Sequence, residues 1–398
     1  MSVSLKVLIL NHNVEWRGTF QRCYDFAKLL AARHHDVTIV TNSKTARFQF
    51  DEYLLDQIKI IRSPDLFWGI LRSGWDPLNV FRRYGYLKNR KFDILHAFDN
   101  RPTVILPALW LQQKLKCPLV SDWCDWWGRG GAIRLRKNKI LNFLFEPIET
   151  YFEERYRRDA DFLTVISDTL KDRAIRLGCD PAKIEVIPPL APVDKIFPIE
   201  KMEARKTLNL SNYNPILIFS GFVLYDIQMV FESYRLVHQS YPKSLLILTG
   251  GVPPALTRKF WDLPILNVGL VSQDLLQNYL GASDLCLLPL SDNLTNQARF
   301  PHKIGHYLAA GRPVVSNPVG EVGSLIQNQN IGILTDPTAE SFARGICRIL
   351  SEPDRLNEMG TNARSVAEKK LSGSQFSEKL EEIYFGCLNN AFCSTSNS

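Results

Sequence analysis

The 398-residue sequence predicts an α/β protein in which two doubly wound parallel-sheet domains face a cleft. Three observations lead to this fold class. Short apolar runs of strand length recur along the chain, stretches with helical spacing separate them, and a proline-rich segment divides the runs into two series of about six. Alternation of strands and helices is typical of parallel sheets with helices on both faces.

The first series of runs precedes the proline-rich segment. These runs are apolar on both faces, as expected for strands buried between two helix layers. The expected strands are residues 5–10, 37–41, Ile94–Phe98, Leu119–Trp123, 162–166 and a weaker 184–188. Helical spacing follows the first of them, over residues 21–32.

The second series predicts the strands Ile216–Gly221, Leu245–Gly250, 265–270, 285–290, 314–317 and 331–335. A helical pattern covers residues 229–241 between the first two. The two series are separated by Pro188, Pro189 and Pro192, which cannot continue a strand or a helix. We therefore expect an N-terminal domain over 1–190 and a C-terminal domain over 191–373. A helix over 374–391 can pack back on the N-terminal domain, and an unstructured tail over 392–398 follows.

Composition restricts the class of protein without identifying a partner. The net charge of +7 favours anionic partners such as phosphates, nucleic acid or an acidic membrane surface. The eight Cys form no C-x-x-C pair and fit a reducing cytoplasm. The first ten residues are too short for a signal peptide, and no apolar stretch approaches the ~18 residues of a spanning helix. The Cys usage and the absence of a signal peptide or a spanning helix lead us to expect a cytoplasmic protein. The seven His show no pattern of a metal site, so we expect no metal.

The turn after the first predicted strand contains Gly18. A glycine between a strand and a helix lets backbone N–H groups approach a phosphate at the helix N-terminus. Gly18 stands alone, without the G-x-G-x-x-G pattern of dinucleotide sites. It could equally do no more than make the turn.

A loop rich in Trp, Asp and Gly follows the predicted strand Leu119–Trp123. Aromatic rings stack on sugar C–H groups, and carboxylates accept hydrogen bonds from sugar hydroxyls. Loops at strand ends also concentrate function. Alternatively, the Trp residues pack between the domains and one Asp caps a helix. The candidates for catalysis and acceptor binding here are Asp122, Trp123, Asp125, Trp126, Trp127 and Arg129.

The strongest chemical signal lies around residues 299–303. Pro301 suits the first turn of a helix, and Gly311 suits its end. Lys303 would then lie at the positive end of the helix dipole, where a cation is unfavourable. A bound diphosphate would compensate, with Arg299 and Lys303 as its ligands. The alternative is that both are solvated surface cations.

Two further segments have alternative interpretations. Gly320 permits close backbone approach at the start of another predicted helix, where Glu321 either caps the helix or binds sugar and ribose hydroxyls. Residues 134–145 are basic and then apolar, like a helix that docks on anionic lipid. An ordinary amphipathic helix with a solvated basic edge fits these residues as well.

Nearly the whole chain resembles the group 1 glycosyltransferases, which have two Rossmann-like domains in the GT-B architecture. The resemblance implies that the domain over 1–190 is the acceptor-side domain and that the domain over 191–373 binds the nucleotide sugar. Residues 17–42 resemble that family's opening glycine loop, helix and strand, and residues 157–178 resemble its passage before the linker. Residues 300–326 resemble its nucleotide-binding passage. These motifs are typical of the fold but not of one substrate.

The resemblance implies roles for individual residues. Gly18 matches the glycine that meets the diphosphate, Asp125 matches the Asp of a His-Asp or Arg-Asp dipeptide, and Lys303 matches the basic residue before the signature helix. The family's Glu-x7-Glu carboxylates fall at Ala298 and His306 and are therefore both absent. The cations that usually follow the first strand of the second domain are also missing from the segment 221–226.

The sequence therefore predicts transfer of a sugar from a nucleotide diphosphate sugar to a glycan, lipid or small-molecule acceptor. The resemblance implies retention, and no cofactor or metal is expected, because cations and helix N-termini can neutralise the leaving diphosphate. We expect peripheral contact with an anionic membrane and no nucleic-acid partner. A binding protein without turnover and a sugar-nucleotide epimerase are the alternatives. The predicted catalytic residues are Asp125, Asp122 and His306, and the predicted nucleotide-sugar ligands are Gly18, Arg299, Lys303, His306, Gly320, Glu321 and Gly221.

Overall fold

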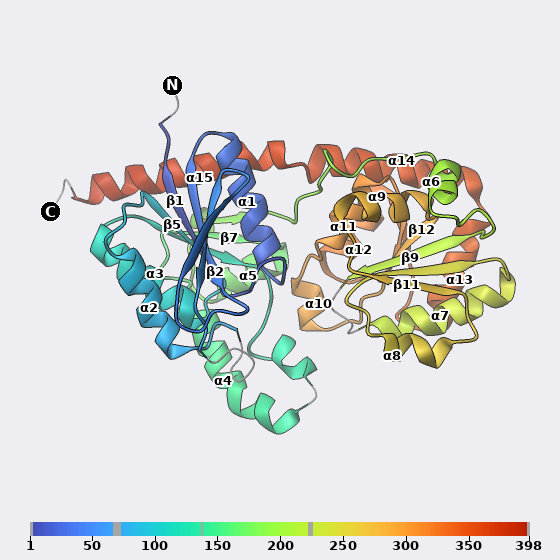
Figure 1. Cartoon of the computed structure of the whole chain (residues 1–398), viewed down its shortest axis with the longest axis horizontal. Helices are drawn as coiled ribbons and strands as arrows, with labels where there is room; N and C mark the ends of the chain where they lie inside the picture. The colour runs from blue at the N-terminus through green and yellow to red at the C-terminus, as the bar shows by residue number, and fades with distance from the viewer. Residues whose placement is uncertain (1–2, 67–72, 137, 222–225, 396–398) are drawn as a thin grey trace. The chain divides into compact units, whose positions relative to one another are not determined.

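The computed structural model describes residues 3–66, 73–136, 138–221 and 226–395. The chain divides into two compact units, each built around its own sheet (Figure 1). The first unit comprises residues 1–188 together with 373–398, and the second comprises residues 189–372. The predicted α/β class with two parallel-sheet domains is confirmed.

The first unit contains, among its described residues, an eight-stranded sheet in the order β3-β4-β2-β1-β5-β6-β7-β8. The strands are β1 (Lys6–Leu10), β2 (Asp36–Asn42), β3 (Asp51–Leu55), β4 (Ile58–Ser63), β5 (Ile94–Phe98), β6 (Leu119–Trp123), β7 (Phe162–Val165) and β8 (Ile184–Val186). The helices are α1 (Phe20–Ala32), α2 (Pro77–Leu87), α3 (Pro102–Leu115), η1 (Ala132–Leu135), α4 (Lys139–Arg155), α5 (Asp168–Arg176), η2 (Pro181–Lys183) and α15 (Gly373–Thr395).

Two strands of this sheet, β3 and β4, were not among the six expected from the sequence. They pair antiparallel at the edge of the sheet, and all other pairs of this sheet in the described residues are parallel. The two residues that join them, Asp56 and Gln57, both have positive φ, as in a type I′ hairpin turn. An edge strand is only partly buried, so β3 lacks the continuous apolar run that identifies the central strands.

The second unit contains a six-stranded, fully parallel sheet in its described residues, in the order β11-β10-β9-β12-β13-β14. All six predicted runs are strands: β9 (Ile216–Gly221), β10 (Leu245–Gly250), β11 (Ile265–Gly269), β12 (Leu285–Leu288), β13 (Val314–Ser316) and β14 (Gly332–Leu334). The helices are α6 (Lys201–Thr207), α7 (Ile227–Ser240), α8 (Pro254–Thr257), η3 (Arg258–Phe260), α9 (Gln273–Ala282), α10 (Leu294–Ala298), α11 (Lys303–Ala309), α12 (Gly320–Gln329), α13 (Ala339–Leu350) and α14 (Pro353–Lys370).

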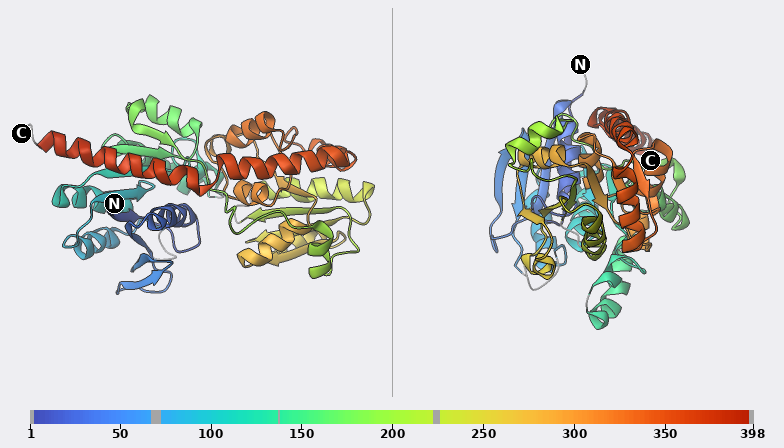
Figure 2. Two further views of the ribbon diagram at one scale, coloured as in Figure 1. Left: turned by 90° about the horizontal axis from the view of Figure 1, so that it is seen from above. Right: turned by 90° about the vertical axis from the view of Figure 1, so that its right-hand side faces the viewer.

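The C-terminal helix α15 belongs to the first unit, although it is the last element of the chain (Figures 1 and 2). Tyr384 lies in the apolar core beside α1, and its hydroxyl is 2.8 Å from Nδ1 of His96 on β5. Glu381 pairs with His35, just before β2. The helix continues to Thr395. The expectation of an unstructured tail from residue 392 is therefore wrong for residues 392–395. Residues 396–398 lie outside the described part.

These contacts make α15 a structural part of the first unit. Tyr384→Ala removes a fully buried ring and should lower the free energy of unfolding by about 3–5 kcal/mol. Tyr384→Phe removes only the hydroxyl and should cost about 1 kcal/mol. Urea unfolding followed by circular dichroism measures both, with exposed Asn389→Ala as the matched control on the same helix. A Tyr384→Ala protein as stable as this control would show that α15 does not support the core.

Candidate functional site

The second unit has a cationic cluster at the carboxyl end of β9, where α11 begins. The Lys303 ammonium lies 4.1 Å from the centroid of the Phe219 ring. Gly221 has a φ of 153°, which favours glycine, and a Cβ atom there would lie only 2.7 Å from Nζ of Lys303, so the ammonium lies directly against this residue. α11 starts at Lys303, and Pro301 therefore precedes the helix instead of lying in its first turn as predicted.

The cluster holds more positive than negative charge. Burial, and then the nearby Arg299 guanidinium, lower the pKa of Lys303 to about 7 against the opposing effect of Asp226. Asp226 lies 3.9 Å from Arg299 and also accepts hydrogen bonds from Ser291 and Asn296. Its carboxylate is therefore shared among several donors. An anion bound beside Lys303 would restore the usual protonation of this lysine.

The start of α12 is packed against the end of α10. Gly320 has a φ of 54°, and a Cβ atom there would lie 2.6 Å from the carbonyl oxygen of Gln297. The Asn317 amide fixes this end of the sheet, since it accepts from the Leu290 N–H and donates to the Thr335 carbonyl. The first turn of α12 thus begins beside the segment that leads into Lys303.

The remaining predicted ligands of the second unit lie on the same two helices. Glu321 is in the first turn of α12, and His306 lies one turn after Lys303 on α11. Ala298, at the other position where the family has a carboxylate, is fully buried. The residues 222–225, which lack the family's usual cations, lie outside the described part of the chain.

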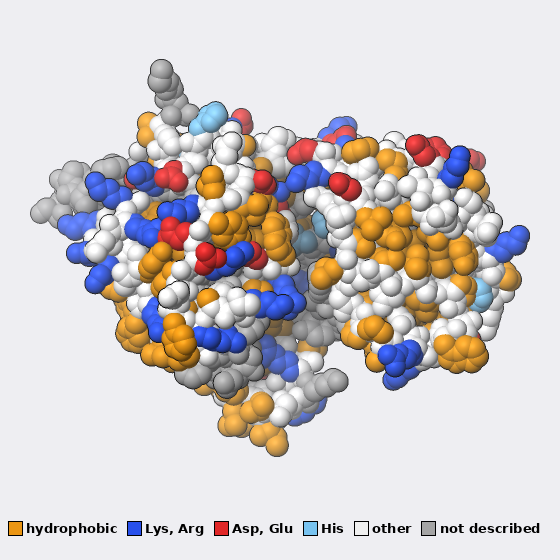
Figure 3. Space-filling model, viewed as in Figure 1, with side chains coloured by type: hydrophobic (Ala, Val, Ile, Leu, Met, Phe, Trp, Pro, Cys, Tyr) orange, Lys and Arg blue, Asp and Glu red, His pale blue; other side chains and the backbone are white. Residues whose placement is uncertain are grey.

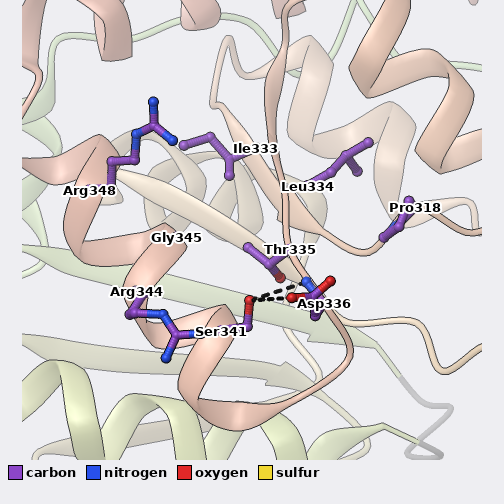
Figure 4. A pocket seen from close by; sticks show the side chains of 9 residues that line it. All are labelled: Pro318, Ile333, Leu334, Thr335, Asp336, Ser341, Arg344, Gly345 and Arg348. Atoms are coloured by element: carbon purple, nitrogen blue, oxygen red, sulfur yellow. Dashed lines mark hydrogen bonds between the residues drawn. The ribbon is translucent and has the colours of Figure 1, made fainter.

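A cavity of about 300 Å³ lies beside β14 and α13 in the same unit (Figure 4). Asp336, Ser341, Arg344 and Arg348 line it, and Ser341 is hydrogen-bonded to the backbone and side chain of Asp336. The cavity shares only Pro318 with the segment that precedes α12. None of the predicted phosphate ligands lines it, so it forms no part of the cationic cluster.

In the first unit, Gly18 makes a tight turn before α1. Its φ is 53°, and a Cβ atom there would lie 2.5 Å from Oδ1 of Asn13. The Asn13 amide donates to the Thr19 hydroxyl, which donates in turn to Oδ1 of Asn11. This network accounts for the glycine through the turn alone, and any contact with phosphate would be additional.

Asp122 and Trp123 lie in the core of the first unit, which corrects their prediction as residues facing a substrate. Both are fully buried. Asp122 accepts hydrogen bonds from Nε and Nη2 of Arg22, the shortest of 3.0 and 2.9 Å, and one of 2.6 Å from the Thr164 hydroxyl. Although burial opposes ionisation, Arg22 keeps the pKa of Asp122 below its usual value. The Trp123 indole N–H donates to the backbone oxygen of Asp125.

The loop after β6 is held by carboxylates of α4. The backbone N–H groups of Trp127 and Gly128 donate to Glu153, at 2.8 and 2.9 Å. Trp126 is buried under the Arg173 guanidinium, which lies 3.7 Å from its ring. Arg129 is exposed and pairs with Glu154.

The half-buried ring of Trp127 lies beside the Arg101 guanidinium, 4.7 Å from its centroid. Of the three loop tryptophans, Trp123 and Trp126 are buried. Trp127 therefore has the most surface available to a ligand.

Sequence reasoning missed Asp99, which directly follows β5. It is buried, has a φ of 64°, and its carboxylate lies 3.8 Å from Nδ1 of His12 at the end of β1. Burial, and then the Asp125 carboxylate, raise its pKa to about 8. Within the described part of the chain, Nδ2 of Asn100 and Nε of Arg101 have no hydrogen-bond partner. A left-handed non-glycine residue and a shifted pKa are typical of functional sites.

The signal for Asp99 was present in the sequence. An Asp-Asn pair follows the predicted strand Ile94–Phe98, at the edge where parallel sheets bind ligands. The strands β1, β5 and β6 are neighbours, so His12, Asp99 and Asp125 follow adjacent strand ends. This polar group and the half-buried Trp127 form the candidate acceptor side.

The raised pKa of Asp99 has a consequence for stability. The folded protein keeps this proton up to about pH 8, and the unfolded chain loses it near pH 4, so stability falls as the pH rises between these values. Asp99→Asn removes this dependence and should stabilise the protein at pH 8 by at least about 1 kcal/mol, with little effect at pH 4.5. Urea unfolding at both pH values measures the difference. Equal effects at the two pH values would contradict the raised pKa.

Comparisons with known proteins agree with this architecture. Residues 16–195 match Glycosyltransferase Family 4, and residues 214–352 match Glycosyl transferases group 1. A D-inositol 3-phosphate glycosyltransferase of Gordonia bronchialis is 28% identical over 236 residues, which are 54% of this chain and 50% of that protein. One from Rhodococcus opacus is 24% identical over 250 residues, 58% of this chain and 54% of that protein. The chain thus spans about half the length of the curated relatives it matches.

Solved structures share the fold over almost the whole chain. Sucrose-phosphate synthase from Thermosynechococcus elongatus has a TM-score of 0.77 and 18% identity, over 97% of this chain and all of that one. HepE from Anabaena, in complex with UDP and glucose, has a TM-score of 0.70 and 18% identity, over 95% of this chain and 98% of that one. A protein from Listeria monocytogenes, described as a putative UDP-N-acetylglucosamine 2-epimerase, has a TM-score of 0.61 and 15% identity, over 96% of this chain and 97% of that one.

Together, the two family matches cover both units, and the structural neighbours include GT-B glycosyltransferases such as the lipopolysaccharide enzyme WaaG. The two largely parallel sheets agree with these matches. The chain therefore belongs to the group 1 glycosyltransferase family, as a divergent member with the GT-B fold.

Proposed function

We propose that this protein transfers a sugar from a nucleotide diphosphate sugar to a glycan, lipid or small-molecule acceptor, with retention and without a metal. The observation that carries the proposal is the cationic cluster of Arg299 and Lys303, where burial and the neighbouring Arg299 lower the pKa of Lys303. A diphosphate supplies the compensating negative charge. The complex of the structural neighbour HepE with UDP and glucose supports a nucleotide sugar as the donor.

Charge stabilisation at the leaving diphosphate would be the main catalytic contribution. Negative charge grows on the diphosphate as the bond to the sugar breaks, and cations fixed in a poorly solvated site stabilise it without reorganising. In this proposal Lys303 and Arg299 supply full charges, and the first turn of α12 at Gly320 supplies N–H groups. His306 or Glu321 binds the ribose in place of the missing carboxylates, and Gly18 also contacts the diphosphate.

The acceptor would bind at the strand ends of the first unit. Trp127 offers a half-buried aromatic face, and Asp125 and Asp99 offer groups that bind hydroxyls. Arg129 lies in the same loop, and the buried Trp126 anchors the loop by packing against Arg173. Asp122 and Trp123 act only by positioning the ends of β5, β6 and β7.

Two observations keep other functions in consideration. The absence of both family carboxylates, with Ala298 buried, favours a protein that binds the donor without turnover. The fold shared with a UDP-N-acetylglucosamine 2-epimerase favours an epimerase as the second alternative. We include in our proposal a cytoplasmic location, peripheral contact with an anionic membrane and no nucleic-acid partner.

The donor site can be tested through the titration of Lys303. After thermal shift with UDP, GDP, ADP and dTDP has identified the preferred nucleotide, its affinity should fall above pH 7.5, by up to about tenfold per pH unit, because binding then requires uptake of a proton by Lys303. Lys303→Met should bind at least about tenfold more weakly at pH 7.5 and should lose this pH dependence. Isothermal titration calorimetry between pH 7.5 and 9 measures both effects.

A matched control is Lys259→Met, which removes an exposed cation from the same unit. Its affinity and pH profile should equal those of the unchanged protein. If Lys303→Met also retained both, the Lys303 cluster would not be the phosphate site.

Turnover distinguishes the three functions. With the preferred donor class, a transferase releases nucleoside diphosphate faster when an acceptor is added and forms a glycosylated product. An epimerase instead isomerises the donor sugar with no acceptor present. Tight nucleotide binding with neither reaction, over a panel of glycan and lipid acceptors, would overturn transfer in favour of a binding protein.

A further inference from the structure

The N-terminal half of α4 and the neighbouring η1 form a projection from the first unit (Figure 1). Hydrophobic side chains gather at the end of this projection (Figure 3). We refer to η1 and the first two turns of α4, residues 132–145, as the α4 tip. Single exposed apolar residues are ordinary on protein surfaces, but a contiguous group marks an interaction site.

The α4 tip reverses the usual pattern of a helix in water. Between residues 140 and 145 the only polar side chain, Asn142, is 7% exposed, whereas Ile140 and Phe143 are 75% and 78% exposed. Leu141, Leu144 and Phe145 are exposed as well. A water-facing helix places its apolar residues inward and its polar residues outward. The inverted arrangement suits an apolar environment around the helix.

Specific contacts hold the α4 tip in this arrangement. The Asn142 amide donates to the backbone oxygen of Arg136 at 2.9 Å, which draws the polar side chain inward. The Asn138 side chain caps the helix by accepting from the Leu141 N–H at 3.0 Å. Arg134 pairs with Glu146 at 2.9 Å. The apolar side chains therefore point outward from a helix start that is held by a cap and an ion pair.

The charge around the α4 tip selects the partner. Residues 126–145 contain five Lys or Arg and no Asp or Glu, and Arg129 and Arg134 among them pair with Glu154 and Glu146 of α4. Arg134 and Lys139 are exposed next to the apolar side chains. This positive surface would repel the same surface of a second copy, whereas an anionic lipid headgroup layer attracts it and provides an apolar layer directly beneath. The described residues include no helix long and apolar enough to span a membrane.

We infer that the α4 tip inserts into the surface of an anionic lipid bilayer. Ile140, Phe143 and Leu144 enter the boundary between headgroups and acyl chains, and Arg134 and Lys139 remain among the headgroups. This goes beyond electrostatic docking, because the exposed apolar side chains add a component that salt does not screen. It rests on the membrane contact included in the proposed function, which it assigns to named residues, and it is independent of the proposed sugar transfer.

Vesicle flotation without donor or acceptor tests the insertion. The full-length protein should bind vesicles of phosphatidylcholine with 30% phosphatidylglycerol more strongly than pure phosphatidylcholine, and part of this binding should persist in 1 M NaCl. Ile140→Gln with Phe143→Gln should weaken binding at least about tenfold at every salt concentration. Lys139→Gln should weaken it mainly at low salt. Trp261→Gln, at an 85% exposed aromatic residue of the other unit, is the matched control and should bind like the unchanged protein.

Thermal unfolding shows that each variant is folded, since exposed substitutions should leave Tm unchanged. Binding that the glutamine pair leaves intact, or that 1 M NaCl abolishes completely, would overturn insertion. A protein that does not bind vesicles would also overturn insertion. If that protein formed concentration-dependent dimers and the glutamine pair abolished them, the α4 tip would bind a second copy instead. Failure of sugar transfer would affect none of these measurements.

Discussion

The buried ion pair between Arg22 and Asp122 is the interaction on which the first unit's functional edge depends. It joins α1 to the end of β6, and Thr164 extends it to β7. Arg22 also donates to the backbone oxygen of Pro188, where this unit reaches the second. Removing one partner of such a pair would leave an uncompensated charge in the core. The pair, together with Thr164, therefore joins three elements near the candidate acceptor edge.

Around this pair, buried residues of the first unit hold the strand ends, and partly exposed residues lie in the loop that follows β6. Asp122 and Trp123 are buried and hold the strand ends, whereas Trp127 and Asp125 lie in the loop that those strand ends carry. Asp99 lies between these two sets, in a left-handed backbone conformation and with its pKa raised. Rigid strands thus position a few strained or titratable groups at one edge of the sheet, as is common at functional sites.

The second unit relies on a charge imbalance instead of a closed pair. Lys303 and Arg299 share one nearby carboxylate, Asp226, which other donors also use. Gly221 and Gly320 leave room that any larger residue would fill. The unit thus combines surplus positive charge with backbone N–H groups at a helix start, which is the chemistry of an anion site. Under the proposed function, the donor supplies the missing negative charge.

The sequence by itself determined the parallel strands, the approximate boundary near the prolines and the segment around Lys303. These features depend on local periodicity, on the restricted backbone of proline and on a cation at a helix start, all of which are visible along the chain. It did not reveal the edge hairpin of β3 and β4, because half-buried strands lack a continuous apolar run. The C-terminal helix was expected to be able to pack back on the N-terminal domain, but its contacts could not be identified, because Tyr384 and His96 lie far apart along the chain.

Only the tertiary structure decided which of the predicted polar and aromatic residues remain available to a ligand. Asp122, Trp123 and Trp127 lie within six residues of one another, and their types gave no reason to separate them. Burial separates them, since Arg22 and Thr164 occupy Asp122 while Trp127 keeps an accessible face. The same holds for residues 134–145, where composition suggested a basic helix and the packing of Asn142 turned the apolar side chains outward. Composition specifies which groups are present, and long-range packing specifies which of them face the solvent.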